Sequence, residues 1–160
     1  MKSNKRTLLI IAHSPSPNTQ AMVNAIHQGA TTPDVESVEV KLSSPFDCNS
    51  EIILNSDALI LFTTENFGYM SGALKDFFDR NYYPCLAEPK RNDAKPFSLV
   101  IKAGLDGTGT DIAVSKIIKG LKWRAVQPTC IFKGEYQSVF LEQCNELGLT
   151  MATSLDAKII

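Results

Sequence analysis

The stretch TLLIIAHSPSPNTQAM, residues 7–22, decides the fold of this chain. Its first six residues are apolar apart from the leading threonine, which is typical of a β-strand that is buried on both faces. Two prolines and four small hydroxyl or amide side chains follow, and the next residues fit the start of a helix. A strand, a loop and a helix in this order form the repeating unit of parallel α/β sheets.

Four more strand-like runs follow the first and are separated by helical patterns, which predicts one α/β domain over residues 1–160. The run at 37–42 alternates apolar residues with Glu39 and Lys41, and Pro128 leads into the last run; both features are typical of strands at the edge of a sheet. With these two runs at the edges, we predict a three-layer fold around a five-stranded parallel sheet of order 2-1-3-4-5. The four later runs are residues 37–42, 58–63, 97–103 and 129–133.

Apolar residues at helical spacing predict further helices that cover the sheet. One stripe begins at Leu74, with Ser71 before it as a candidate N-cap, a second begins at Val114, and a third begins at Phe140. Residues 43–57, between the second and third runs, are too few for a regular helix, and we expect a loop there with one or two helical turns.

Composition and charge argue against several classes of binding partner. Sixteen Lys and Arg residues balance seventeen Asp and Glu residues without clustering, which argues against a surface for nucleic acid or anionic membranes. No apolar run is long enough for a signal-peptide core or a membrane span, so we expect a cytoplasmic protein. The four cysteines lie far apart without metal-binding spacing, so we expect reduced thiols, no disulfide and no metal site. Only Cys85 is expected to be exposed enough to react.

The loop after the first run is predicted to bind an anion. In a sheet of order 2-1-3-4-5, ligands bind at the carboxyl ends of the strands, between strands one and three, where the strand order reverses. With Ser16 as N-cap and Pro17 at the first helical position, the amides of residues 18–20 are expected to stay free and to bear partial positive charge. A phosphate monoester fits this pocket, because Ser14 and its neighbours add neutral hydrogen bonds. Taken alone, the same residues are more simply explained as a cap that starts a helix.

Two further loops emerge at the same edge and suggest the rest of the ligand. Residues 63–80 follow the third run and place Phe67, Tyr69 and Met70 on a loop, where apolar side chains need a partner. Residues 103–111 follow the fourth run and are rich in glycine, which lets backbone amides approach a ligand closely. The three loops together suit a ligand with a phosphate at one end and a planar ring at the other.

The residues of these loops resemble a known family. ENFGYMSGALKDFFDR, residues 65–80, resembles the second flavin loop and the following helix of flavodoxin-like NAD(P)H-dependent FMN reductases and quinone reductases, and residues 14–19 resemble their phosphate loop. The resemblance implies an FMN whose phosphate is held at 14–19 and whose ring lies between residues 65–70 and 104–107. With the neighbouring backbone included, the expected cofactor-binding residues are Ser14, Ser16, Asn18, Thr19, Gln20, Thr64, Glu65, Asn66, Phe67, Gly68, Tyr69, Met70, Gly104, Leu105, Asp106 and Gly107.

Two positions depart from the family pattern. Pro17 stands where a glycine is usual, which removes one backbone donor to phosphate. Glu65 stands near the position of a common proline, and a carboxylate pointing inward there would disfavour a reduced, anionic flavin. We therefore expect the Glu65 side chain to point to solvent while its backbone faces the ring.

The resemblance implies an oxidoreductase in which the flavin carries the chemistry. Hydride would pass from NADH or NADPH to the flavin and then to a quinone or a similar small acceptor. Backbone amides near Asp106 and Gly107 would stabilise negative charge on the ring, water would supply protons, and Asp106 is a candidate proton relay. His13 is expected to be structural, and a homodimer is implied by analogy. Which nucleotide and acceptor are used, and what residues 82–90 do, stays open.

Specific residues argue against other functions. The main alternative is an electron-carrier flavodoxin without a substrate of its own, although carriers are usually strongly acidic around the flavin and this chain has Lys75, Arg80 and Lys102 nearby. A phosphoacceptor receiver domain would need an acidic pair after the first strand, where this chain has His13 and Ser14. The absence of GxSxG and GxxxxGK[ST] motifs argues against a nucleophile elbow and a P-loop.

Overall fold

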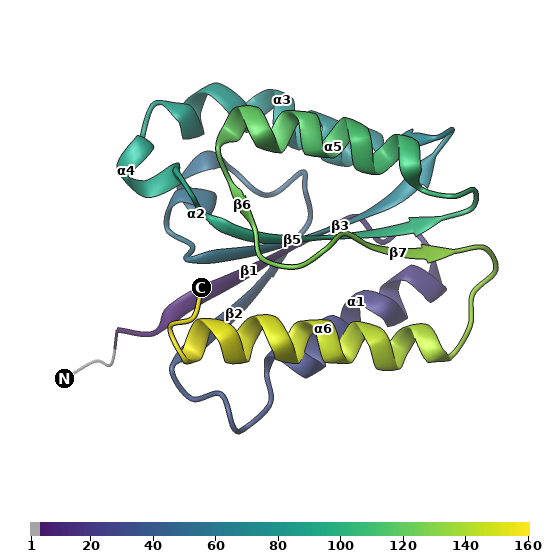
Figure 1. Cartoon of the computed structure of the whole chain (residues 1–160), viewed down its shortest axis with the longest axis horizontal. Helices are drawn as coiled ribbons and strands as arrows, with labels where there is room; N and C mark the ends of the chain where they lie inside the picture. Colours follow the sequence, from purple (N-terminus) through teal and green to yellow (C-terminus); the bar gives the residue numbers. More distant parts are fainter. Residues whose placement is uncertain (1–3) are drawn as a thin grey trace.

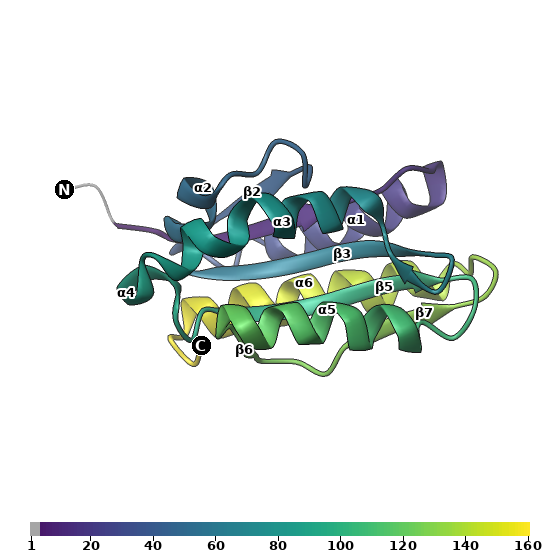
Figure 2. The ribbon, with the colours of Figure 1, turned by 90° about the horizontal axis from the view of Figure 1, so that it is seen from above.

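A mainly parallel sheet forms the middle layer of the molecule, and helices cover both of its faces (Figure 1). The computed structural model describes residues 4–160. Helices α2, α3 and α5 lie on one face, and α1 and α6 lie on the other (Figure 1 and Figure 2). The strands are β1 (Arg6–Ala12), β2 (Val38–Ser43), β3 (Ala58–Asn66), β4 (Tyr69–Met70), β5 (Pro96–Ala103), β6 (Arg124–Ala125) and β7 (Cys130–Lys133). The helices are α1 (Pro17–Ala30), α2 (Ser50–Leu54), α3 (Gly72–Leu86), α4 (Pro89–Asn92), α5 (Thr108–Leu121) and α6 (Val139–Asp156).

The sheet has the predicted strand order. β2, β1, β3 and β5 lie side by side and parallel, and β5 pairs on its outer side first with β6 and then with β7. β6 and β7 together occupy the place of the predicted fifth strand, so the order 2-1-3-4-5 is confirmed. Between them the ladder is interrupted: Phe97 pairs with Ala125, and the next parallel pair joins Val100 to Cys130. Pro128 lies in this interruption, where the ladder needs no N–H donor, so proline costs no hydrogen bond there.

The central strands send alternate side chains into two separate cores. Leu9 of β1 and Leu61 of β3 belong to the core that contains residues of α3 and α5. Ile10 and Ile60, one position along each strand, belong to the core built with α1 and α6. All four side chains are at most 1% exposed. Burial on both faces therefore explains the continuous apolar runs, as predicted.

Helices α1 and α6 cross at very short range because each carries a glycine at the contact. A Cβ on Gly29 would lie 1.9 Å from the carbonyl oxygen of Asn145, and a Cβ on Gly148 would lie 2.0 Å from that of Ile26. Real side chains do not reach such distances, so only glycine fits either position at this separation. The contact fixes α1, and with it the loop that precedes α1, against the rest of the molecule.

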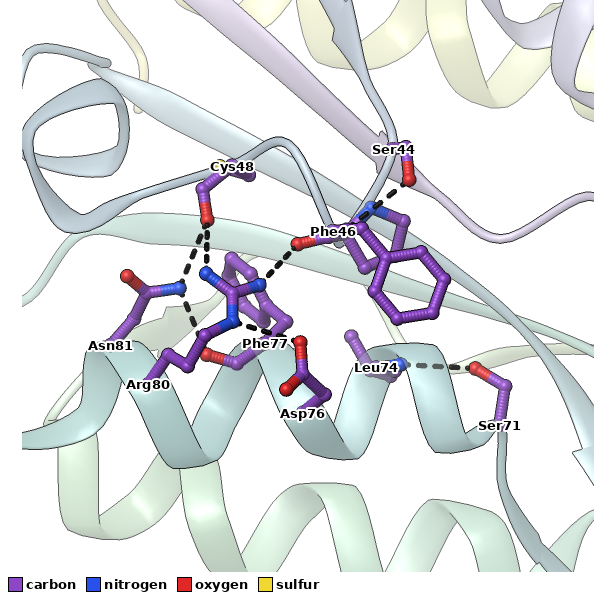
Figure 3. Close-up of polar contacts among 10 residues, drawn as sticks. Ser44, Phe46, Cys48, Ser71, Leu74, Asp76, Phe77, Arg80 and Asn81 are labelled. Atoms are coloured by element: carbon purple, nitrogen blue, oxygen red, sulfur yellow. Dashed lines mark hydrogen bonds and ion pairs between the residues drawn. The ribbon is translucent and has the colours of Figure 1, made fainter.

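The connection after β2 is anchored on α3 by Arg80 (Figure 3). The Arg80 guanidinium donates to the carbonyl oxygens of Pro45 (2.7 Å) and Cys48 (3.2 Å). Its Nε donates to the Asp76 carboxylate one helical turn away (2.8 Å). The only helix in the segment predicted as a loop with one or two turns is α2, which has five residues, so that prediction is confirmed.

The predicted exposure of Cys85 is wrong. Helix α3 continues through residues 82–86, with Pro84 in its last turns. The side chain of Cys85, which belongs to this helix, is fully buried. Burial raises the pKa of the Cys85 thiol to about 11 and that of Cys48 to about 12. All four cysteines are free thiols.

Within residues 4–160, no helix is long and apolar enough to cross a bilayer. The same part of the chain contains no group of three His, Cys, Asp or Glu side chains arranged to hold a metal ion.

Candidate flavin site at the sheet edge

The carboxyl ends of β1, β3 and β5 lie at one edge of the sheet, on the right in Figure 1. Three loops leave from this edge, at residues 13–16 after β1, 67–68 after β3 and 104–107 after β5. The chain continues from β1 to β2 on one side and reaches β3 on the other, so the strand order reverses here. This is the edge at which open α/β sheets bind ligands.

The first loop is closed by a capping box at the start of α1. The Ser16 hydroxyl accepts from the Thr19 amide (3.2 Å), and the Thr19 hydroxyl accepts from the Ser16 amide (3.0 Å). The Gln20 amide donates to the Ser16 carbonyl at 2.9 Å. The prediction that the amides of Thr19 and Gln20 stay free is therefore wrong, because Ser16 satisfies both. Thr19 is also buried, so its hydroxyl serves the helix cap.

Ser14 and Asn18 are the polar groups that this loop leaves available. Neither side chain has a hydrogen-bond partner within residues 4–160; Ser14 is half-buried and Asn18 is exposed. The Asn18 amide lies in the first turn of α1, where it has no intrahelical acceptor and contributes to the positive end of the helix dipole. Pro17 adds no donor. The loop can therefore bind an anion with fewer groups than the sequence predicted.

His13 lies at the base of this loop and stiffens it. Its amide donates to the Phe62 carbonyl of β3 at 3.0 Å, which extends the pairing between β1 and β3 by one residue. Burial lowers the pKa of the imidazole below its ordinary value of 6.5, so His13 is uncharged at neutral pH. It therefore adds no positive charge to the anion site, in agreement with a structural role.

The second loop is a tight β-hairpin. β3 and β4 pair in antiparallel fashion, with Glu65 opposite Met70 and Asn66 opposite Tyr69. The two turn residues, Phe67 and Gly68, both have positive φ values, 54° and 72°, as a two-residue hairpin turn of type I′ requires. Such a conformation is unusual for a bulky residue like Phe67. The hairpin was not predicted from the sequence, which indicated only a loop with apolar side chains here.

The hairpin is fixed at its base by buried hydroxyl groups. The Thr63 hydroxyl accepts from the Ser71 amide (3.1 Å), and the Ser71 hydroxyl accepts from the Leu74 amide (3.2 Å). Ser71 is thereby the N-cap of α3, as predicted. Thr63 and Ser71 are both fully buried, so these bonds are shielded from water.

The Glu65 carboxylate binds the third loop, and the prediction that it points to solvent is wrong. The Leu105 amide donates to Glu65 Oε1 at 2.7 Å, and the Gly107 amide donates to Oε2 at 2.8 Å. These amides precede α5, where backbone donors lack helical acceptors and the helix dipole favours negative charge. Gly107, at φ 73°, turns the chain into the helix. The amides that were expected to face a ring are thus engaged by a side chain from the neighbouring loop.

The hairpin also rests directly on the first turn of α5. A Cβ on Gly109 would lie only 2.3 Å from the Gly68 carbonyl oxygen. The second and third loops are therefore joined at two points, by the Glu65 hydrogen bonds and by this backbone contact.

Asp106 lies in the third loop but is held ionised. Its carboxylate accepts from the Thr108 amide at 3.0 Å, and this hydrogen bond lowers the pKa of Asp106. A carboxylate that stays ionised has no proton to donate at neutral pH. The structure therefore gives no support to Asp106 as a proton relay.

Apolar side chains from two loops are exposed at the same edge of the sheet. Phe67 is fully exposed at the hairpin turn, and Leu105 is 69% exposed on the third loop. Tyr69 is 40% exposed, whereas Met70 is buried in the core and cannot border a ligand at this edge through its side chain. Among the remaining expected residues, Thr64 bonds Asn66 Oδ1 through its hydroxyl (2.9 Å).

Comparison with known proteins identifies the fold. No protein-family model matches the chain, and no curated protein is significantly similar in sequence. A flavodoxin from the domain Archaea superposes with a TM-score of 0.75 at 19% identity, over 93% of this chain and 98% of that one. The chain has the flavodoxin fold.

Two other flavodoxin-like structures with different descriptions superpose nearly as well. A WrbA-like flavodoxin from Agrobacterium tumefaciens gives a TM-score of 0.72 at 18% identity, over 96% of this chain and 98% of that one. The apo form of an NADH:FMN oxidoreductase gives 0.68 at 16% identity, over 94% and 90%. At these identities the flavodoxin fold is established, and function has to be argued from the site itself.

Proposed function

We propose that this protein binds FMN at the carboxyl edge of β1, β3 and β5 and acts as a redox protein. The observation that supports the proposal is the pairing of two features at one edge: unpaired donors at Ser14 and Asn18 on the positive end of α1, and exposed apolar side chains at Phe67 and Leu105. The first feature fits a phosphate, and the second fits a flat apolar ring. Solved structures of the same fold include proteins described as flavodoxins and as an NADH:FMN oxidoreductase.

The role of the protein in this proposal is to bind and to orient. Ser14 and the Asn18 amide and side chain would hold the phosphate, and the backbone of the hairpin would border the ring. A bound flavin supplies hydride transfer between a nicotinamide and an acceptor. Asp106 is held ionised, and His13 is neutral at the base of the first loop, so we assign neither of them a proton transfer.

We further propose that the protein is an enzyme that oxidises NADH or NADPH and reduces a quinone or a similar small acceptor. The charges around the edge are mixed: Lys75 pairs with Asp79 (2.6 Å), and the Glu65 carboxylate is bound by two amides. This edge is thus not the strongly acidic surface that steers a carrier to basic partners. A homodimer and a cytoplasmic location, both expected from the sequence, are part of the proposal; sedimentation velocity tests the dimer.

The decisive experiment measures FMN binding by calorimetry and then adds NADH or NADPH with a quinone. We expect one FMN per chain and nucleotide oxidation that depends on the quinone. Replacing both Ser14→Ala and Asn18→Ala should weaken FMN binding by about a hundredfold, because each lost hydrogen bond to a charged group accounts for about tenfold.

Ser138→Ala is a matched control, since Ser138 is exposed at the start of α6 and its side chain makes no capping bond. FMN binding without reduction by either nucleotide would support the carrier instead. Absence of FMN binding would overturn both functions.

A further inference from the structure

The backbone amides of Leu105 and Gly107 converge on one negatively charged group. They meet both oxygens of the Glu65 carboxylate at 2.7 and 2.8 Å. These are short, charge-assisted hydrogen bonds, which are roughly twice as strong as bonds between neutral groups. The third loop therefore presents a ready site for an oxygen acceptor, and in this structure the chain itself supplies that acceptor.

The same amides lie on the third loop, at the edge where the ring of the proposed FMN would bind. Next to them, the Thr108 amide is already taken by the Asp106 carboxylate at 3.0 Å. A flat ring inserted between the hairpin and the third loop would bring the carbonyl groups of its polar end toward Leu105 and Gly107. The ring carbonyl group would then have to replace the Glu65 carboxylate as the acceptor of these two hydrogen bonds.

We propose that Glu65 is an internal competitor for the polar edge of the flavin ring: FMN binds fully only when its carbonyl oxygen displaces the Glu65 carboxylate from the Leu105 and Gly107 amides. The inference rests on the proposed FMN function. Because the oxidised ring carries no charge, its carbonyl group is a weaker acceptor than a carboxylate, and the exchange lowers the affinity of the protein for FMN. Glu65 thereby holds the two loops together in the free protein and limits how tightly the cofactor is retained.

The displaced carboxylate would not be left buried. Glu65 lies at the end of β3 near the exposed hairpin turn and is only half-buried, so a change of side-chain rotamer brings it to water. The hairpin would keep its second support, the contact between Gly68 and the first turn of α5. Displacement therefore requires a side-chain movement and no rearrangement of the backbone.

The test compares FMN dissociation constants of the full-length wild type, Glu65→Ala and Glu65→Gln by calorimetry. Freeing the amides in Glu65→Ala should tighten FMN binding by about tenfold or more, which corresponds to about one charge-assisted hydrogen bond. Glu65→Gln keeps the shape of the side chain but not its charge, so it should also tighten FMN binding. It serves as the test if Glu65→Ala fails to fold. Glu135→Gln is the matched control, because it removes an exposed acid that follows β7 at the same edge and should leave affinity unchanged.

A second measurement follows the Glu65 carboxyl carbon by ¹³C NMR in the wild type. On saturation with FMN, its resonance should move to the position of a solvent-exposed glutamate, while the Leu105 and Gly107 amides stay protected from hydrogen exchange. An unmoved carboxyl resonance, or unchanged or weaker FMN binding by both Glu65 variants, would overturn the role of Glu65 and leave the FMN function standing. Failure of all forms, wild type and variants, to bind FMN would overturn the proposed function itself.

Discussion

Glu65 illustrates how one side chain alters the chemistry of a loop 40 residues away in sequence. Its type and position were visible in the sequence, but its hydrogen-bond partners were not, because an isolated acid on a loop is normally best solvated by water. The pairing arises only when β3 and β5 lie next to each other and two amides before α5 are left without helical acceptors. The hydrogen bonds of the first loop were also not visible in the sequence. There, Ser16 caps the helix as predicted, but it also accepts hydrogen bonds from the Thr19 and Gln20 amides that were predicted to be free.

His13 makes the stability of the protein depend on pH. Burial lowers its pKa below 6.5, so between that lowered value and 6.5 the unfolded chain binds a proton that the folded protein does not. The free energy of unfolding therefore increases as pH rises through this window, and His13 adds no further change above it. We expect the urea midpoint to rise with pH in the wild type and to rise less steeply in His13→Gln. Equal slopes in the two proteins would contradict this assignment.

At the level of elements, local sequence patterns predicted the central strands well and the segments held by tertiary contacts poorly. The runs that became β1, β3 and β5 were recognisable because burial on two faces selects continuous apolar residues. The hairpin was missed because its turn has Phe67 at a position where Asn, Asp or Gly is usual. The helix through Pro84 was missed because proline normally ends a helix, whereas here it occurs near the end of α3.

The crossing of α1 and α6 depends on Gly148. In an isolated helix, alanine would be more stable than glycine by about 1 kcal/mol. At Gly148, however, a Cβ would meet the Ile26 carbonyl at 2.0 Å and force the helices apart. We expect Gly148→Ala to lower the free energy of unfolding by about 1–3 kcal/mol in urea denaturation.

Gly72→Ala is the control for this substitution. Gly72 begins α3, and a Cβ there would meet no atom within 4 Å, so the change should be neutral or slightly stabilising. If Gly148→Ala were equally harmless, the close helix contact would not be a determinant of stability.

For the whole molecule, the fold was predictable, because strand order follows from which runs are polar, and strand order in turn predicts the edge at which a ligand binds. The hydrogen bonds within and between the loops at this edge were predicted less well. Hydrogen bonds between loops depend on side-chain positions that no local pattern encodes, as the contacts of Glu65 and Thr19 show.

The reactivity of the cysteine thiols measures how intact the fold is. Burial raises the pKa of all four thiols; Cys130 is half-buried, and the other three cysteines are fully buried. We expect the native protein to react slowly with Ellman's reagent at neutral pH, first at Cys130, and all four thiols to react quickly in urea. Cys130→Ser should remove the early phase. Rapid modification of several thiols without denaturant would show that the two cores open readily.

The division of the outer strand into β6 and β7 has a consequence for how copies of this protein behave at high concentration. A long, regular outer strand offers a row of unused backbone groups on which another chain can add a strand, which is a common route to aggregates. Here the outer strand consists of two short pieces with Pro128 between them, and the opposite outer strand, β2, carries Glu39 and Lys41. Both borders of the sheet thus disfavour the addition of a strand from another copy.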